Sequence, residues 1–160
     1  MTTETVLDLV ELGIVPQSAR ALGQTLTPIA NGSRRRLANG ELVSRKRVSF
    51  EKFASTISFS DTYAPAFGDL WAGETITVYC VCEINEKVGR PFQRPPVPGS
   101  VIYRDAGGKV VPHGSDETVA PVGALWRTYR PIIVFMVDGW DMDTDEYAAV
   151  VSSTLNLFEA

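Results

Sequence analysis

The feature that most limits the fold of this chain is a short-range alternation of apolar and polar residues. Within residues 48–60, Phe53, Ile57 and Phe59 share one parity, while the other carries Ala54, Thr56, Ser58 and Ser60. Because successive side chains of a β-strand point to opposite faces, this period of two predicts a strand with one buried face. Residues 74–84 repeat the alternation and are predicted to form a central strand.

Turn-forming residues are spread along the whole chain. The sequence has 13 Gly and 10 Pro among 160 residues, and four of these prolines fall within residues 88–99. Dispersed Gly and Pro favour many short elements joined by turns, which favours β over α structure. The proline-rich segment is expected to be extended and to carry no sheet. We therefore predict a single mostly β, antiparallel sandwich or barrel-like domain over residues 18–160.

Three other segments also have the composition of strands. They are rich in β-branched and aromatic residues, or they alternate apolar with polar residues. They cover residues 19–29, 125–137 and 147–158, and the first of them has an arm on a neighbouring molecule as its alternative. The predicted core consists of Phe53, Ile57, Phe59, Ile76, Val78, Cys80, Cys82, Ile132, Val134, Met136, Leu155 and Leu157.

Two glycine-containing pairs predict hairpins. Asn39-Gly40 is the strongest local signal, because a type I′ turn needs positive φ at both central residues and this pair tolerates it. It is expected to join residues 34–38 to residues 41–47. Gly107-Gly108 predicts a second, shorter hairpin.

Residues 1–17 are predicted to form a short helix or an arm. A cluster of apolar residues follows Thr2 and Thr3, with Glu4 early and Gly13 late, as in a short capped helix. The acidic residues of this segment stand where a signal peptide would carry positive charge. Synthesis in a cytoplasm is therefore expected, and no membrane partner is expected.

Few residues offer catalytic chemistry. His113 is the only histidine and lies in a polar loop sequence, so a catalytic triad or a small hydrolase would depend on it. Cys80 and Cys82 lie on one face of a predicted strand, where they cannot easily bridge and where burial raises a thiol pKa. The sequence thus predicts a protein that is not an enzyme and needs no cofactor.

Three alternating aspartates resemble the start of a calcium-binding loop. Asp141, Asp143 and Asp145 have the right spacing, but Glu146 and Ser152 stand where such a loop needs Gly and Glu. No metal site is predicted. The residues from Asp138 to Glu146 lie between two predicted strands and are expected to form an acidic, solvated turn or an interface.

Charge is divided unevenly along the chain. Residues 20–52 contain eight Arg or Lys against two Glu, whereas residues 138–159 contain six acidic and no basic residues. The net charge of −4 gives no overall attraction to phosphate backbones, so nucleic acid is not an expected partner. If the two regions lie on different sides, a basic hairpin can face the acidic turn of the next copy; the alternative is neutralisation within one chain. The interface candidates are Arg34, Arg35, Arg36, Arg45, Lys46, Arg47, Trp140, Asp141, Asp143 and Asp145.

Four segments carry a resemblance to a known class of proteins. Residues 34–43, 56–61, 70–78 and 129–137 resemble small virion structural proteins of tailed bacteriophages, within a similarity over residues 18–158. The resemblance implies a β-rich subunit present in many copies, in the tail or neck or as a capsid decoration. It implies contacts with other copies and other virion proteins, and no catalytic residue.

A second class of function also fits the sequence. Trp71, Trp126 or Trp140, with nearby carboxylates, would serve a carbohydrate- or surface-binding module that recognises a host-surface glycan. The sequence therefore favours a virion assembly subunit and leaves glycan binding as the alternative.

Overall fold

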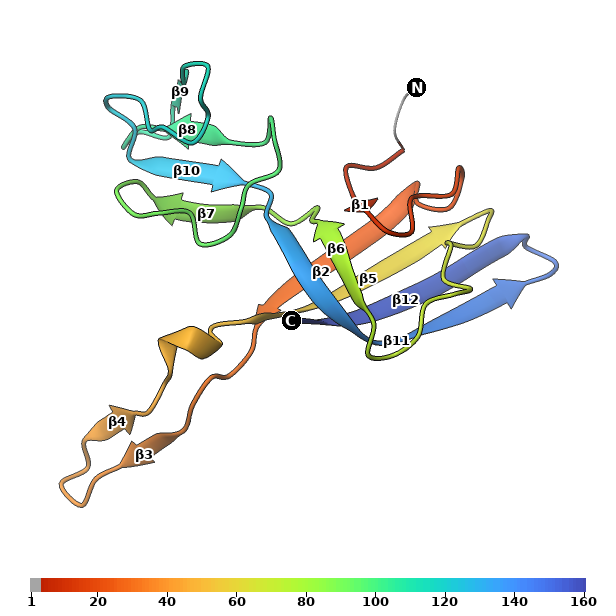
Figure 1. Ribbon diagram of the computed structural model, residues 1–160, viewed down its shortest axis with the longest axis horizontal. Coiled ribbons are helices and arrows are strands. Elements are labelled where there is room, and N and C mark those ends of the chain that lie inside the picture. Colours follow the sequence, from red (N-terminus) through yellow and green to blue (C-terminus); the bar gives the residue numbers. More distant parts are fainter. Residues whose placement is uncertain (1–3) are drawn as a thin grey trace.

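The computed structural model describes residues 4–160, and its regular structure consists of twelve strands and one short 3-10 helix (Figure 1). The strands are β1 (Asp8–Leu9), β2 (Ala21–Pro28), β3 (Arg34–Arg36), β4 (Leu42–Ser44), β5 (Phe53–Asp61), β6 (Thr75–Tyr79), β7 (Ile84–Lys87), β8 (Ile102–Arg104), β9 (Val110–Val111), β10 (Trp126–Tyr129), β11 (Ile132–Asp145) and β12 (Val150–Glu159). The 3-10 helix η1 covers Val48–Phe50. The predicted mostly β, barrel-like architecture is confirmed.

The strands form three antiparallel sheets. The largest has the order β1-β6-β11-β12-β5-β2 and curls into a half-barrel (Figure 1). A second sheet has the order β7-β10-β8-β9, and β3 pairs with β4 alone. The half-barrel uses β2 and β12 at the places where the sequence predicts strands, and the proline-rich segment carries no strand, as predicted.

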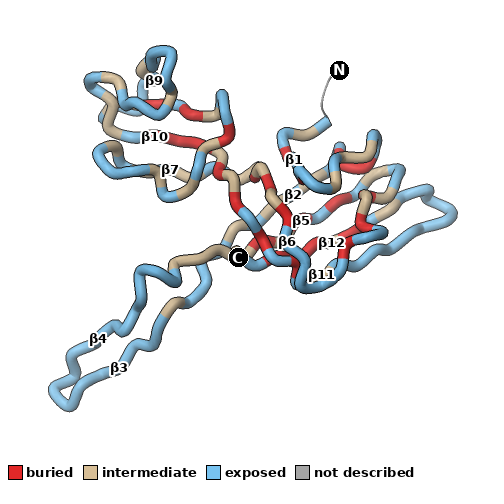
Figure 2. The backbone as a smooth tube through the Cα atoms, in the orientation of Figure 1, coloured by how far each residue is buried: buried red, intermediate tan, exposed pale blue. Residues whose placement is uncertain are grey.

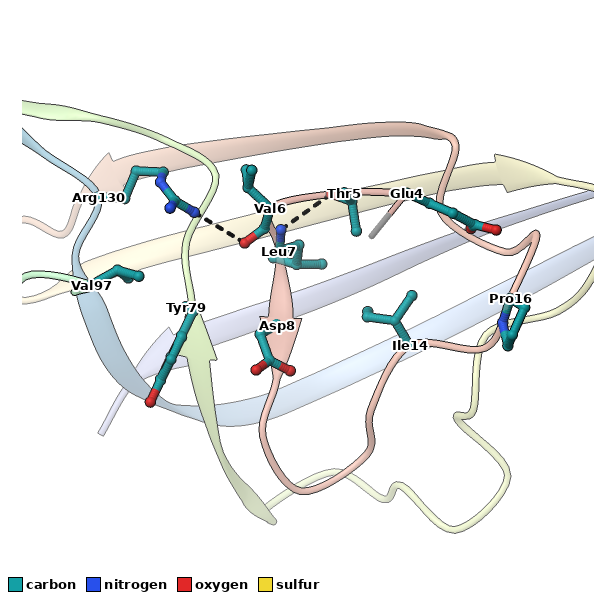
Figure 3. A pocket seen from close by; sticks show the side chains of 10 residues that line it. All are labelled: Glu4, Thr5, Val6, Leu7, Asp8, Ile14, Pro16, Tyr79, Val97 and Arg130. Atoms are coloured by element: carbon teal, nitrogen blue, oxygen red, sulfur yellow. Dashed lines mark hydrogen bonds between the residues drawn. The ribbon is translucent and has the colours of Figure 1, made fainter. Parts of the chain in front are cut away.

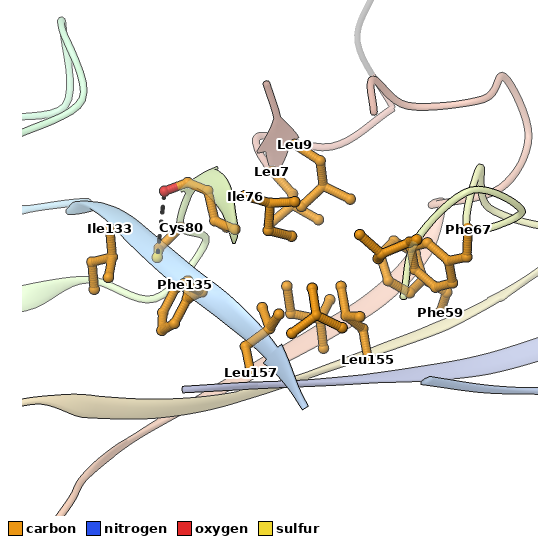
Figure 4. Packing of buried hydrophobic residues seen from close by; sticks show 14 of the residues in the cluster. Leu7, Leu9, Phe59, Phe67, Ile76, Cys80, Ile133, Phe135, Leu155 and Leu157 are labelled. Atoms are coloured by element: carbon orange, nitrogen blue, oxygen red, sulfur yellow. Dashed lines mark hydrogen bonds between the residues drawn. The ribbon is translucent and has the colours of Figure 1, made fainter. Parts of the chain in front are cut away.

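The main core fills the concave side of the half-barrel (Figure 4). Ile57, Phe59, Leu155 and Leu157 reach it from β5 and β12, and each is at most 2% exposed. The loop between β5 and β6 adds Phe67, whose ring centroid lies 5.4 Å from that of Phe59. Each such side chain contributes about 1.5–3 kcal/mol when buried, so this face holds the fold together. A smaller core under the second sheet contains Val101, Tyr103 and Tyr129.

The predicted N-terminal helix is wrong. Leu9 belongs to β1, which pairs with β6, and the chain then turns at Gly13. Leu7 and Leu9 are both buried in the main core. An isolated helix of ten residues is marginal in water, so burial of alternate leucines against the sheet decides the conformation. Thr2 and Thr3, which the helix prediction used as caps, lie outside the described residues.

Two predicted strands are each divided between the sheets. Residues 74–84 supply β6 and only the first residue of β7, and residues 125–137 supply β10 and the start of β11. The two breaks lie side by side, where the amide of Cys80 donates to the carbonyl of Pro131 over 3.0 Å. Since proline has no N–H to donate, Pro131 interrupts the pairing at the point where the chain passes between sheets.

The predicted core parity of β11 is also wrong. Val134 and Met136 are 48% and 44% exposed, whereas their neighbours Ile133, Phe135 and Val137 are buried. All residues from 132 to 137 are apolar, so the sequence has no alternation there to reveal the buried face. The pairing of β11 with β6 and β12 selects it instead.

Both predicted hairpins are present, but the turn at Asn39-Gly40 differs from the type I′ expectation. The amide of Gly40 donates to the carbonyl of Leu37, and Gly40 has a φ of 85° while Asn39 does not have positive φ. This is a type I turn followed by a left-handed glycine, the usual three-residue hairpin loop. The Gly107-Gly108 hairpin repeats the arrangement, with Gly108 at a φ of 82°.

Candidate functional site

The feature that stands out from the body of the protein is a projecting hairpin, residues 31–50, which we call the basic arm. It comprises β3, β4 and η1, and it extends away from both larger sheets (Figure 1). Residues 32–50 are all exposed, so neither face of the hairpin packs on the body (Figure 2). The arm contributes nothing to either core of its own chain.

The root of the arm is held by backbone contacts. The side-chain amide of Asn31 donates to the carbonyl of Arg47 over 3.1 Å, and the amide of Arg45 donates to the carbonyl of Ser33 over 2.9 Å. The two sides of the arm root lie close together at Gly32, where an added Cβ would be 2.5 Å from the Arg45 carbonyl oxygen. Only glycine fits this position without a shift of the opposite strand.

A partly buried ion pair anchors the root to the body. Arg94 Nε lies 2.6 Å from Glu159 Oε1, and its Nη2 donates to the carbonyl of Glu51 over 2.7 Å. Glu159 also accepts the amide of Phe53 over 2.8 Å. These contacts join the proline-rich segment, the end of β12 and the arm root. Because Glu159 is paired with Arg94, it does not belong to the free acidic surface that the sequence suggested for residues 138–159. No local sequence motif indicated the pairing of Arg94 with Glu159.

The surface of the arm is both basic and apolar. It brings together the six predicted basic residues Arg34, Arg35, Arg36, Arg45, Lys46 and Arg47. Among residues 4–160 only Lys46 of this set forms an ion pair, with Glu51 at 3.2 Å. Leu42 is 54% exposed and Val48 is 70% exposed, so apolar side chains lie between the charges. The sequence predicted the charges but gave no sign that these apolar residues would be unburied.

The predicted acidic turn is wrong in its structure. β11 continues through Asp145, and the chain turns only at residues 146–149 before β12. The period of two puts Asp141, Asp143 and Asp145 on one face of this strand. Aspartate and glycine are typical of turns, so the composition concealed a strand that is held by its pairing with β12. We call residues 138–150 the acidic hairpin.

The carboxylates of the acidic hairpin are open to solvent. All residues from 141 to 150 are exposed, and no ion pair involves the hairpin among the described residues. Asp145 Oδ1 accepts the amides of Tyr147 and Ala148, each over 3.0 Å, which fixes the turn. A nearby ion pair at this end of the sheet joins Arg20 to Asp61 at 2.6 Å, and its hydrogen bonds lower the pKa of Asp61.

Trp140 belongs partly to the interior of its own chain. Its Nε1 donates to the carbonyl of Leu70 over 2.7 Å, and its ring lies 5.8 Å from that of Phe67. The indole thus holds the loop between β5 and β6 against β11. It remains 36% exposed at the base of the acidic hairpin.

The two charged hairpins lie at opposite ends of the molecule. The basic arm extends to the lower left of Figure 1, whereas the tip of β11 and β12 lies at the far right. No ion pair connects them among residues 4–160. The charges therefore do not neutralise each other within one chain.

A pocket of about 530 Å³ lies beside the N-terminal segment (Figure 3). Its lining is mostly apolar, and Arg130 crosses it to donate to the carbonyl of Val6 over 3.1 Å. The ten described lining residues are Glu4, Thr5, Val6, Leu7, Asp8, Ile14, Pro16, Tyr79, Val97 and Arg130. They include no cysteine, histidine or serine, and no nucleophile is paired with a base there.

The residues with the most reactive side chains, the two cysteines and the histidine, do not line this pocket. Burial raises the pKa of the Cys80 thiol to about 12 and also raises that of Cys82, so both thiols are protonated at neutral pH. Both are free, and Cys82 Sγ lies 3.1 Å from the carbonyl oxygen of Gln24. His113 is exposed in a loop, where its Nδ1 lies 2.7 Å from the carbonyl oxygen of Gly114. No hydrogen bond in the described structure links it to a carboxylate or a nucleophile.

Other site types have no representative among residues 4–160. No group of three or more His, Cys, Asp or Glu side chains is placed to hold a metal ion there. The same residues include no helix that could cross a lipid bilayer. Comparisons with protein-family models, with curated proteins and with solved structures give no match for the chain.

Proposed function

We propose that this protein is a structural subunit of a bacteriophage particle, present in many copies in the tail or neck, which assembles through its basic arm. The observation that carries the proposal is the arm itself, a fully exposed hairpin with six basic residues and unburied apolar side chains. Decoration of the capsid shell is the alternative location. In either location, the partners of the protein would be other copies of the chain and other virion proteins.

The physical argument concerns the stability of the arm. A two-stranded hairpin without a packed face is marginally stable in water. Exposed apolar side chains and strand edges of this kind are typical of surfaces that pair with another molecule. An arm that gives its own domain no core contacts therefore has its use in assembly.

Removal of the arm tests the proposal. In the variant, residues 34–44 are replaced by an Asn-Gly turn between Ser33 and Arg45, whose backbones are already hydrogen-bonded. We expect light scattering at increasing concentration to show ordered oligomers for the natural chain and monomers for the variant, with the same unfolding temperature. Monomeric natural protein at every concentration would contradict the proposal.

Glycan binding remains the second candidate because Trp71 is 72% exposed. An exposed indole is a suitable platform for a sugar ring. Of the other two tryptophans, Trp126 belongs to β10 of the second, four-stranded sheet, and Trp140 is packed against Phe67. Tryptophan fluorescence titrated with host-surface glycans tests this function. A response in the natural chain that is lost in Trp71→Ala would favour it, and an unchanged spectrum would remove it.

A further inference from the structure

We infer that the basic arm of one copy binds the acidic hairpin of a second copy, so that the subunits join head to tail. This inference rests on the proposed function and names the surface that receives the arm. The partner of each hairpin is thus a second copy of this chain. The inference draws on charge, on exposed apolar side chains and on the positions of the two hairpins.

Charge complementarity is the first argument. The arm has six basic residues and one acidic residue, Glu41, while the acidic hairpin has five acidic residues and no basic one. Neither set is neutralised in its own chain, apart from the pair between Lys46 and Glu51. Arg20, whose partner Asp61 pairs with Val151 close to the tip of the acidic hairpin, is already engaged in that ion pair. Opposite fields of this kind steer association and fix its register.

Carboxylates alone do not define a receiving surface, and the second argument is apolar. The side chain of Tyr147 at the tip of the acidic hairpin is 99% exposed, and Met142 and Val150 are each 38% exposed. The arm presents Leu37 and Leu42, which are at least half exposed. Val150 pairs with Asp145 and shares its face, whereas Met142 lies on the opposite face of β11 from Asp141 and Asp143. Exposed aromatic and aliphatic residues close to charged ones are typical of a protein interface.

The third argument is geometric. The arm and the acidic hairpin lie at opposite ends of one molecule (Figure 1). A contact between two different surfaces at opposite ends is heterologous, so each added copy leaves a free arm and a free acidic hairpin. Such a contact repeats until a ring closes or a helical array grows. Both outcomes agree with a subunit used in many copies.

Two charge-reversed variants test the inference. One carries Arg34→Glu, Arg35→Glu and Arg45→Glu, and the other carries Asp138→Lys, Asp143→Lys and Glu146→Lys. None of these six side chains makes a hydrogen bond in the described structure, so the fold is expected to tolerate them. Each variant alone should need about tenfold or more protein to assemble, because three exposed ion pairs become repulsive. An equimolar mixture should assemble again, since the reversed arm meets the reversed hairpin.

The control is a third variant with Lys87→Glu, Arg90→Glu and Lys109→Glu. These three exposed cations lie in or beside the strands of the second, four-stranded sheet. It changes the net charge as much as the arm variant and should assemble like the natural chain. Sedimentation velocity at low and high salt is the measurement, and assembly of the natural chain should weaken as salt rises. If the natural chain assembles and the acidic-hairpin variant assembles equally well, the inference is overturned and the proposed function stands. A natural chain that never assembles would overturn both.

Discussion

At the scale of single residues, Gln24 closes the gap in the curled sheet. Its Oε1 accepts the amides of Val81 over 2.7 Å and Cys82 over 3.3 Å, and its Nε2 donates to Ser55 Oγ over 3.1 Å. These bonds connect the edge strand β2 to the chain that leaves β6. The side-chain amide of Gln24 thus bridges the open side of the half-barrel.

Replacement of Gln24 by Leu tests this role. The amides of Val81 and Cys82 would lose their acceptor in a partly buried position, which costs about 1–3 kcal/mol. We expect urea unfolding to show a loss of that size in Gln24→Leu. The matched control is Gln93→Leu, whose side chain is exposed and should change stability little. Equal stability of both variants would contradict the account.

The thiol of Cys80 gives a pH-dependent expectation. Burial raises its pKa from 9.0 to about 12, so the folded chain holds the proton more tightly than the unfolded chain. This contribution to stability is complete below about pH 9 and is lost as the pH rises toward about 12. In urea unfolding across that interval, the natural chain should lose more stability than Cys80→Ala. Parallel losses in the two proteins would show that Cys80 ionises freely.

At the scale of elements, the sequence predicts strands best where polarity alternates. In β5 and β12 serine and threonine alternate with apolar residues, and the buried faces of Ile57 and Leu155 are predicted correctly. In the apolar run of β11 the buried face depends on pairing partners far along the chain, which local sequence does not encode. The same reason explains the missed strand around Asp143.

The candidate surfaces were predictable to a similar extent. The charges of the arm and the turn at Gly40 follow from local composition. The pairing of Arg94 with Glu159 and the exposure of Tyr147 depend on contacts or their absence across the whole fold. Burial is a property of tertiary structure. An apolar residue in a strand pattern therefore does not reveal whether its hairpin packs against the rest of the protein.

The direction of the arm depends on Gly32. An added Cβ would lie 2.5 Å from Arg45 O and 2.7 Å from Lys46 Cα, so Gly32→Ala should separate the strands at the root. We expect faster hydrogen exchange at the amides of Arg45 and Arg47, with the unfolding temperature unchanged because the arm carries no core residue. Gly114→Ala is the control, since nothing lies within 4 Å of its Cβ position. Equal exchange in the two variants would show that the root tolerates a side chain.

At the scale of the whole molecule, the body and the two hairpins have different tasks. The curled sheet and the smaller sheet hold the buried cores, and the Arg94 contacts tie the arm root to both. The arm and the acidic hairpin leave this body at opposite ends. A rigid body with complementary ends is suited to repeated addition of identical subunits.

Cross-linking between differently labelled copies tests the central claim most directly. Unlabelled and nitrogen-15-labelled chains, both carrying Arg35→Lys, are mixed and treated with a carbodiimide, which couples primary amines to carboxylates in contact. Lys46 and Glu51, 3.2 Å apart, provide the link expected within one chain. The account predicts links of mixed isotope between position 35 and the acidic hairpin, identified by mass spectrometry. Arm links confined to single chains, at concentrations where the protein is assembled, would contradict it.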